Sequence, residues 1–164
     1  EQMGVTPYNV FVCSHNSVSM PGTEANAMKN YYPGDMYVDW LGVSCYPPSL
    51  SATYPEERRY PLTLMQGIKQ VSADKPIMIS EGGYSSTCDH QRWVREWFKL
   101  KDEEPRVKAV VWENHENAEN GDRRLQSDPL ALELYKELVQ DPYWLDLIPD
   151  AVYSEIETRK NNSK

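Results

Sequence analysis

The sequence predicts an α/β domain with a parallel β-sheet. Four short segments are rich in β-branched and aromatic residues, and helical patterns or long loops separate them. The segments are nearly continuous apolar runs, which is typical of strands buried on both faces of a parallel sheet. Such a sheet either stays open, as in a doubly wound domain, or forms part of a closed barrel.

The four predicted strands are residues 8–13, 37–45, 76–80 and 107–112. The first is almost wholly apolar, so we expect both of its faces to be buried. The third opens with Pro76, which is tolerated at the first position of a strand because no amide donor is needed there. No glycine-rich phosphate-binding motif follows any of the four runs, which argues against a nucleotide-binding fold.

Three helices are expected between and after these strands. Residues 60–71 and 89–100 place apolar side chains at three- and four-residue spacings. The buried face of the second helix is predicted to consist of Trp93, Val94, Trp97 and Phe98.

The last helix is predicted to begin at Pro129, which suits the first helical position, with Ser127 or Asp128 as its N-cap. Its apolar stripe is expected to contain Leu130, Leu134 and Leu138.

Composition excludes several classes of function. The 164 residues include 25 acidic and 17 basic side chains, with a formal net charge of −8. Because nucleic-acid binding needs clustered Lys and Arg, we expect no nucleic-acid partner. No apolar run approaches the ~20 residues that span a bilayer, so no membrane span is expected. The length fits one domain, followed by a polar tail at residues 157–164.

Neither a disulfide scaffold nor a metal site is indicated. Cys13, Cys45 and Cys88 cannot all pair with one another, which leaves buried free thiols, one bridge with a spare thiol, or pairing with another chain segment. His15 and His115 lack the spacing of a zinc site with these cysteines, and no cofactor is expected. The acidic loop at residues 113–120 is interpreted as solvated, with calcium binding through its Glu113, Glu116 and Glu119 as the alternative.

Glu81 is the strongest candidate for a functional residue. It follows the apolar run of the third strand, and the carboxyl ends of parallel strands carry the functional groups in α/β folds. A carboxylate at the end of a buried strand must be hydrogen-bonded or functional. Gly82 and Gly83 would permit positive φ and close approach of a ligand to the backbone. The alternative is that Glu81 caps a helix or forms an ion pair in a loop.

Residues at the other strand ends suit carbohydrate binding, since aromatic rings stack on sugars and amides bind their hydroxyl groups. Tyr46 follows the second strand and is placed to donate its hydroxyl proton to Glu81. Trp112 ends the fourth strand as either a sugar platform or a core residue. The other predicted substrate-binding residues are Asn16, Tyr84 and Asn114.

Several segments together resemble family-26 glycoside hydrolases, chiefly endo-β-1,4-mannanases. Residues 30–43, NYYPGDMYVDWLGV, are similar to that family's YYPGDxYVDWxGxxxY motif, and residues 75–81, KPIMISE, to its KPxMxxE strand. Residues 105–112 resemble its last barrel strand, and residues 122–127 the segment before its final helix. The resemblance runs from Asn9 to Trp144.

The resemblance implies a (β/α)8 TIM barrel with retaining chemistry, of which residues 1–156 would form only the C-terminal half, strands 5–8. Glu81 would be the nucleophile, Tyr46 its hydrogen-bonding tyrosine, and Trp112 part of the sugar cleft. In the family the acid/base glutamate lies on the fourth strand, upstream of every match. We therefore expect an N-terminal half-barrel, or a second copy of the chain, to complete the sheet around a polysaccharide substrate, and the isolated chain to be inactive. Secretion is implied by the family alone.

Three positions depart from the family pattern. Cys13 and Glu113 stand where aromatic residues are common, and His15 where a proline is common. The resemblance therefore leaves the sugar subsites, and with them the polysaccharide, open, and Glu113 as a substitute acid is an alternative. The alternative to an enzyme is a non-catalytic carbohydrate-binding or structural subunit that keeps the barrel scaffold. A complete small α/β domain of unrelated function is the third reading.

Overall fold

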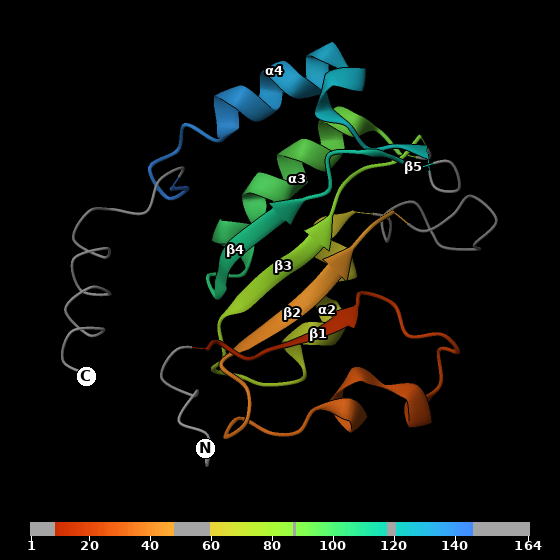
Figure 1. Ribbon diagram of the computed structural model, residues 1–164, viewed down its shortest axis with the longest axis vertical. Coiled ribbons are helices and arrows are strands. Elements are labelled where there is room, and N and C mark those ends of the chain that lie inside the picture. The colour runs from red at the N-terminus through yellow and green to blue at the C-terminus, as the bar shows by residue number, and fades with distance from the viewer. Residues whose placement is uncertain (1–8, 48–59, 87, 118–120, 146–164) are drawn as a thin grey trace.

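A four-stranded parallel sheet forms the centre of the computed structural model, which describes residues 9–47, 60–86, 88–117 and 121–145 (Figure 1). Its strands are β1 (Val12–Asn16), β2 (Trp40–Cys45), β3 (Ile77–Gly82) and β4 (Val107–Trp112). Their spatial order is β1-β2-β3-β4, so each strand pairs in parallel with the next one along the chain. The predicted α/β class with a parallel sheet is confirmed.

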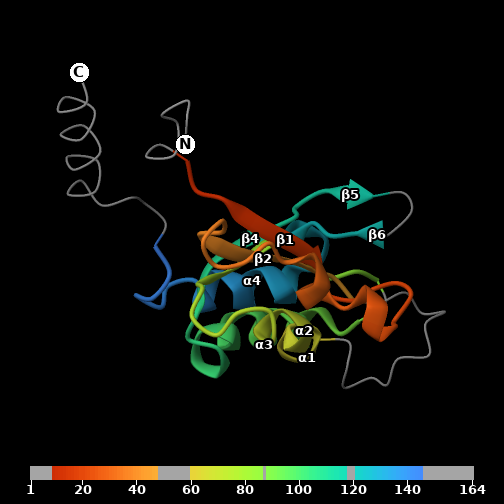
Figure 2. The same cartoon turned by 90° about the horizontal axis from the view of Figure 1, so that it is seen from below.

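The α-helices lie on one side of this sheet (Figure 2). They are α1 (Pro61–Leu64), α2 (Gln66–Lys69), α3 (His90–Glu103) and α4 (Pro129–Leu138). Three short 3₁₀ turns, η2 (Glu24–Asn26), η3 (Met28–Tyr31) and η5 (Leu125–Ser127), complete the helical elements of the described residues. The helix α4 packs against α3, where the Phe98 and Tyr135 rings meet edge to face at 5.1 Å.

The core lies between the sheet and α3. All four predicted core residues of α3 are buried, and the β-strands supply the fully buried Leu41, Val43, Ile77, Ile79 and Val107. The helix begins at His90 because the Asp89 carboxylate accepts a hydrogen bond from the Arg92 amide at 2.9 Å, which satisfies one free donor of the first turn. The strongly amphipathic α3 thus holds the sheet on one face.

No described α-helix covers the opposite face of the sheet. On this face the Ser14 and Ser80 hydroxyls of β1 and β3 lie 2.7 Å apart across β2. They meet because Gly42 of β2 has no side chain, and a Cβ there would lie 2.8 Å from the Ser14 Cβ. Val111 of β4 is also exposed. The sheet therefore has one packed face and one uncovered face among the described residues.

The first strand differs from its prediction. It covers Val12–Asn16 rather than residues 8–13, and its burial was overestimated, because Val10 and Phe11 are 64% and 49% exposed. The physical reason is position: β1 is an edge strand of a sheet that is covered on one face only. Its residues 12, 14 and 16 are exposed, while 13 and 15 are half-buried.

Two helical predictions also need correction. The expected helix 60–71 is divided into α1 and α2 at Met65, with the helix-weakening Gly67 in the second piece. A Cβ at Gly67 would lie 2.8 Å from the Met28 Cε, so the glycine admits that side chain to the core. In α4, Leu130 is 66% exposed, and Ala131 occupies the buried position instead.

The start of the last helix is confirmed. Asp128 is the N-cap, and its Oδ1 accepts hydrogen bonds from the amides of Leu130 and Ala131 at 3.0 and 3.1 Å. Pro129 occupies the first helical position.

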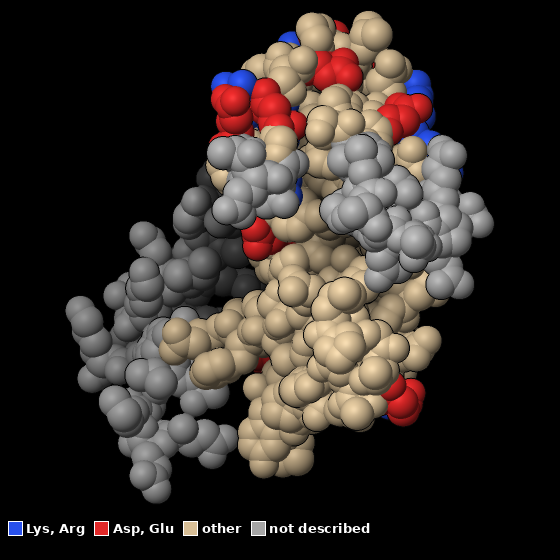
Figure 3. Space-filling model, turned by 90° about the vertical axis from the view of Figure 1, so that its right-hand side faces the viewer, with Lys and Arg blue, Asp and Glu red and all other residues tan. Residues whose placement is uncertain are grey.

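The remaining sequence expectations concern charge, thiols and the chain ends. On the side shown in Figure 3, charged side chains gather toward one end, while much of the remaining surface is uncharged. The three cysteines are free thiols. Within the described ranges, no helix has the length and apolar character needed to cross a bilayer. The predicted polar tail at residues 157–164 lies outside the described residues, and the domain boundary at 156 stays a prediction.

Candidate functional site

The carboxyl ends of β2 and β3 bring Tyr46 and Glu81 together. Because these parallel strands are neighbours, the residues that end them meet at one edge of the sheet. The Tyr46 hydroxyl donates a hydrogen bond to Glu81 Oε1 at 2.6 Å, the contact expected from the sequence. Glu81 is exposed and Tyr46 half-buried, so the carboxylate faces solvent while its donor is supported from behind. The arrangement offers an accessible anionic oxygen in a fixed orientation.

A β-bulge aims Glu81 toward this edge. Val43 pairs with Ile79, but the next residue, Ser44, pairs with Glu81, so Ser80 is an additional residue on β3. The pairing of β3 with β4 is irregular over the same stretch. Bulges redirect side chains and are frequent beside active sites. The apolar pattern of the sequence contains no signal for this bulge.

The two glycines after Glu81 do not act as the sequence suggested. Among the described glycines, only Gly34 and Gly121 have positive φ, so neither Gly82 nor Gly83 needs the left-handed region. At Gly82 a Cβ would lie 2.5 Å from the Trp97 Cη2, so the glycine admits a core tryptophan rather than a ligand. At Gly83 the nearest atom would be 3.5 Å away, which leaves ordinary space.

Glu113 follows the end of β4, and its side chain is a second carboxylate near Tyr46. Its Oε2 accepts a hydrogen bond from the Arg123 Nη1, and its Oε1 lies 3.1 Å from the His115 Nδ1. The Arg123 guanidinium also stacks on the Tyr46 ring, with its central carbon 4.0 Å from the ring centroid. Burial, then the nearby carboxylates of Glu113 and Glu81, raise the pKa of Tyr46 far above its usual value. The phenol therefore stays protonated and remains a hydrogen-bond donor.

Trp112 and Tyr84 pack into the core behind this edge. The Trp112 ring meets Tyr84 and Trp97 edge to face at 5.2 and 5.3 Å, and its Nε1 donates to the Arg123 carbonyl at 3.1 Å. Trp112 keeps partial exposure, whereas Tyr84 is fully buried. A buried ring offers no face to a sugar, so Tyr84 is left out of the proposed binding surface.

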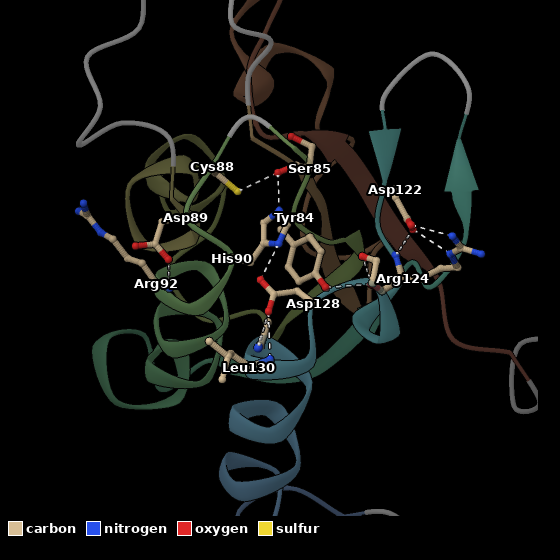
Figure 4. Close-up of polar contacts among 12 residues, drawn as sticks. Tyr84, Ser85, Cys88, Asp89, His90, Arg92, Asp122, Arg124, Asp128 and Leu130 are labelled. Atoms are coloured by element: carbon tan, nitrogen blue, oxygen red, sulfur yellow. Dashed lines mark hydrogen bonds and ion pairs between the residues drawn. The ribbon is translucent and has the colours of Figure 1, made fainter.

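Tyr84 instead belongs to a polar cluster that joins α3 to α4 (Figure 4). Its ring stacks on that of His90 at 4.0 Å, and its hydroxyl donates to the Arg124 carbonyl at 2.9 Å. The His90 Nδ1 lies 3.0 Å from Asp128 Oδ2, and its Nε2 lies 3.1 Å from the Ser85 carbonyl. Both partners are acceptors, so both bonds form at once only with the imidazolium ion. The cluster fixes the loop that follows Glu81 to the start of α4.

The two predicted asparagines lie at opposite sides of the sheet. Asn16 ends β1 and, together with His15 and Tyr31, lines a small cavity of about 220 Å³ beside η3. Asn114 follows β4, and its Oδ1 accepts a hydrogen bond from the Leu125 amide at 2.8 Å, which anchors η5. A role of either residue in substrate binding stays a prediction.

The described part of the chain brings no three metal-ligating side chains together. Cys13 and His15 make one contact of 3.4 Å between Sγ and Nε2, and burial raises the pKa of the Cys13 thiol. In the acidic loop, Glu116 pairs with Arg124 at 3.3 Å, while Glu119 lies outside the described residues.

Arg123 is the residue of this site that sequence reasoning missed. Its side chain is buried between Tyr46 and Glu113, although arginine is normally exposed. It stands next to the exposed Arg124, and no pattern in the segment distinguishes the two. Only the position of the preceding hairpin, in which residues 116–117 pair with residues 121–122, reveals the difference.

Comparisons with known proteins agree with this geometry at the level of fold. No family model matches the chain. Endoglucanase H of Acetivibrio thermocellus is 29% identical over 113 residues, which are 66% of this chain and 12% of that protein. An endo-β-1,4-mannanase double mutant of Cellulomonas fimi has a TM-score of 0.51 and 18% identity, over 83% of this chain and 31% of that one.

The catalytic domain of a GH26 endo-β-1,4-mannanase of Bacillus sp. JAMB-750 has a TM-score of 0.48 and 19% identity, over 82% of this chain and 38% of that one. The chain therefore spans less than two fifths of the length of each of these three proteins. The fold is similar to that of the Cellulomonas fimi endo-β-1,4-mannanase, which agrees with the resemblance that the sequence motifs indicate.

Proposed function

We propose that this chain supplies the nucleophile side of a retaining β-1,4-glycan hydrolase, with a mannan-type polysaccharide as substrate. Glu81 is the nucleophile and Tyr46 holds it. The observation that carries the proposal is the 2.6 Å hydrogen bond from Tyr46 to an exposed Glu81 at the carboxyl edge of a parallel sheet. This edge is where α/β folds place their chemistry.

The proposed reaction step follows from this geometry. A Glu81 oxygen attacks the anomeric carbon, the bond to the leaving oxygen breaks, and a covalent glycosyl ester forms. A carboxylic acid protonates the leaving oxygen and later activates the water that hydrolyses the ester. The hydrogen bond from Tyr46 keeps the other lone pairs of Glu81 oriented toward the sugar.

The acid/base group is proposed to come from outside the described residues. Glu113 is the second carboxylate near Tyr46, but Arg123 and His115 engage both of its oxygens. Among the described residues, one sheet face is uncovered and the outer edges of β1 and β4 are unpaired, and a further set of parallel strands would pair with these edges and bury this face. An N-terminal half-barrel, or a second copy of this chain, is the proposed partner, and the assembly is proposed to act outside the cell.

Covalent trapping tests the assignment of Glu81. A 2-deoxy-2-fluoro-β-mannosyl fluoride carries a leaving group that departs without protonation, so labelling requires the nucleophile but no general acid. The chain, alone and in its native assembly, is incubated with this reagent, and the peptides are analysed by mass spectrometry. We expect one added fluorosugar on the peptide that contains Glu81, with loss of fluoride.

The matched controls are Glu81→Gln and Glu116→Gln. Glu116 is an exposed glutamate of the same edge whose carboxylate pairs with Arg124, so its variant should label like the wild type. Glu81→Gln should not label. Equal labelling of Glu81→Gln and the wild type would show that another residue attacks the sugar.

A non-catalytic carbohydrate-binding subunit is the second candidate. The engagement of Glu113 favours it, because Arg123 and His115 already occupy both oxygens of this second carboxylate near Tyr46. In that case mannan retards the chain in affinity electrophoresis, whereas the fluorosugar labels no residue in any assembly. Labelling distinguishes the two candidates, because both bind mannan and only the hydrolase forms a covalent adduct.

A further inference from the structure

Arg123 is held in place by its own backbone. It follows the hairpin formed by β5 (Glu116–Asn117) and β6 (Gly121–Asp122), which pair antiparallel. Its amide donates to the His115 carbonyl at 3.1 Å, and its carbonyl accepts from the Trp112 Nε1 at 3.1 Å. The hairpin therefore returns the chain to the end of β4 and points one arginine inward.

The guanidinium of Arg123 lies between two members of the candidate site. It pairs with the Glu113 carboxylate and stacks on the Tyr46 ring, and only 7% of the residue is exposed. Its Nε is buried and has no hydrogen-bond partner within the described residues. A buried donor without an acceptor is costly and rare, so the side chain is held here by its other contacts rather than by complete hydrogen bonding.

Tyr46 has one hydroxyl proton and two carboxylates beside it. A phenol donates a single hydrogen bond, so only one of Glu81 and Glu113 receives that proton. After burial, hydrogen bonding to Glu113 and then to Glu81 raises the pKa of Tyr46, so both carboxylates lie within reach of its hydroxyl. In the structure the proton is directed to Glu81, at 2.6 Å. The feature that distinguishes the two carboxylates is Arg123, which pairs with Glu113 and, among the described residues, forms no ion pair with Glu81.

We propose that Arg123 is a positioning residue that engages Glu113 and thereby directs the Tyr46 proton to Glu81. The role assigned to Glu81 here rests on the proposed function. The cation satisfies part of the charge of Glu113 and so weakens its competition for the phenol, and its planar group supports the Tyr46 ring from one face. Removal of Arg123 leaves two carboxylates competing for one proton, and Glu81 loses its fixed orientation.

The hydroxyl proton of Tyr46 reports this arrangement directly. A 2.6 Å bond to a carboxylate protects the proton from exchange with water, so the wild-type chain should show a downfield hydroxyl resonance with contacts to the Glu81 methylene protons. The resonance is assigned by its loss in Tyr46→Phe. In Arg123→Met we expect the Tyr46 hydroxyl proton to exchange with water about tenfold faster, which corresponds to the loss of roughly one hydrogen bond. The proton should then show nuclear Overhauser contacts to Glu113.

Two further variants make the test specific. Glu113→Gln removes the competing charge, so its Tyr46 resonance should stay as in the wild type. The double variant Arg123→Met/Glu113→Gln removes the buried charge together with its partner and should restore the wild-type resonance. The double variant also provides the answer if Arg123→Met alone does not fold.

Three results overturn the proposal: a wild-type chain without a protected Tyr46 hydroxyl, an Arg123→Met chain with an unchanged resonance, or a double variant whose resonance stays displaced. None of these measurements depends on hydrolysis, so they are separate from the test of the nucleophile. In an assembly that turns over substrate, Arg123→Met should lower kcat with little change in KM, and the double variant should recover kcat. A merely structural role for Arg123 would not give that recovery.

Discussion

Alanine at Gly82 and at Gly83 should have opposite consequences, although the two glycines are adjacent. A Cβ at Gly82 would lie 2.5 Å from the Trp97 Cη2 and 2.6 Å from the Cys45 carbonyl oxygen. Neither neighbour can move freely, because Trp97 is fully buried and the carbonyl belongs to the end of β2. At Gly83 the nearest atom is 3.5 Å away, within ordinary van der Waals contact.

The magnitude follows from the packing. Overfilling a close-packed core costs typically 1–3 kcal/mol, and two contacts about 1 Å too short place Gly82→Ala near the upper end, at about 3 kcal/mol. For a chain of this size that corresponds to a decrease in Tm of roughly 6–12 °C. Gly83→Ala should change the free energy of unfolding by less than about 0.5 kcal/mol.

Thermal unfolding followed by far-UV circular dichroism measures both variants against the wild type. Urea unfolding supplies the free energies and checks that the m value is unchanged. Equal melting temperatures for the two variants would refute the reasoning, since they would mean that Trp97 does not pack over Gly82. A destabilised Gly83→Ala would show instead that this loop needs glycine for its backbone conformation.

Three other outcomes are expected. Burial alone would raise the pKa of Asp128, but hydrogen bonds from the α4 amides and from His90 outweigh it and lower the pKa. The carboxylate therefore stabilises the fold above its unfolded pKa near ~4, and this stabilisation is lost as the pH falls. Asp128→Asn keeps the helix cap, so its urea midpoint should fall less than that of the wild type between about pH 5 and 2. Phe98→Ala should lower the free energy of unfolding in urea by about 3–5 kcal/mol, because Phe98 is buried, and Leu130→Ala by less than about 0.5 kcal/mol, because Leu130 is exposed. Similar losses for the two variants would contradict the exposure of Leu130 on α4. Tyr46→Phe should slow fluorosugar labelling by roughly tenfold to a hundredfold through the lost charge-assisted hydrogen bond, and an unchanged rate would exclude the tyrosine from positioning the nucleophile.

Much of the sheet could be predicted because its apolar runs are short and continuous. Three of the four strands overlap their predicted ranges closely, and the helix α4 begins where its capping residues indicated. Apolar character does not, however, say what covers a strand. Val10 and Phe11 belong to an apolar run and remain exposed, because the face and the edge they occupy have no described partner.

The site was only partly predictable for a related reason. Glu81 and Tyr46 end neighbouring strands, so their proximity follows from parallel pairing alone. The bulge at Ser80, the fit of Trp97 over Gly82 and the inward direction of Arg123 depend instead on contacts between distant segments. Sequence patterns report the preferences of single segments, and such contacts leave no trace in them.

The consecutive strand order has a consequence for how the chain folds during its synthesis. Each strand finds its partner in the unit synthesised just before it, so every pairing closes a short stretch of polypeptide and none awaits a distant segment. The sheet can therefore grow one unit at a time as the nascent chain leaves the ribosome. Arrested nascent chains of increasing length should gain protease resistance in successive steps, whereas a single step at full length would indicate that the sheet assembles only after release.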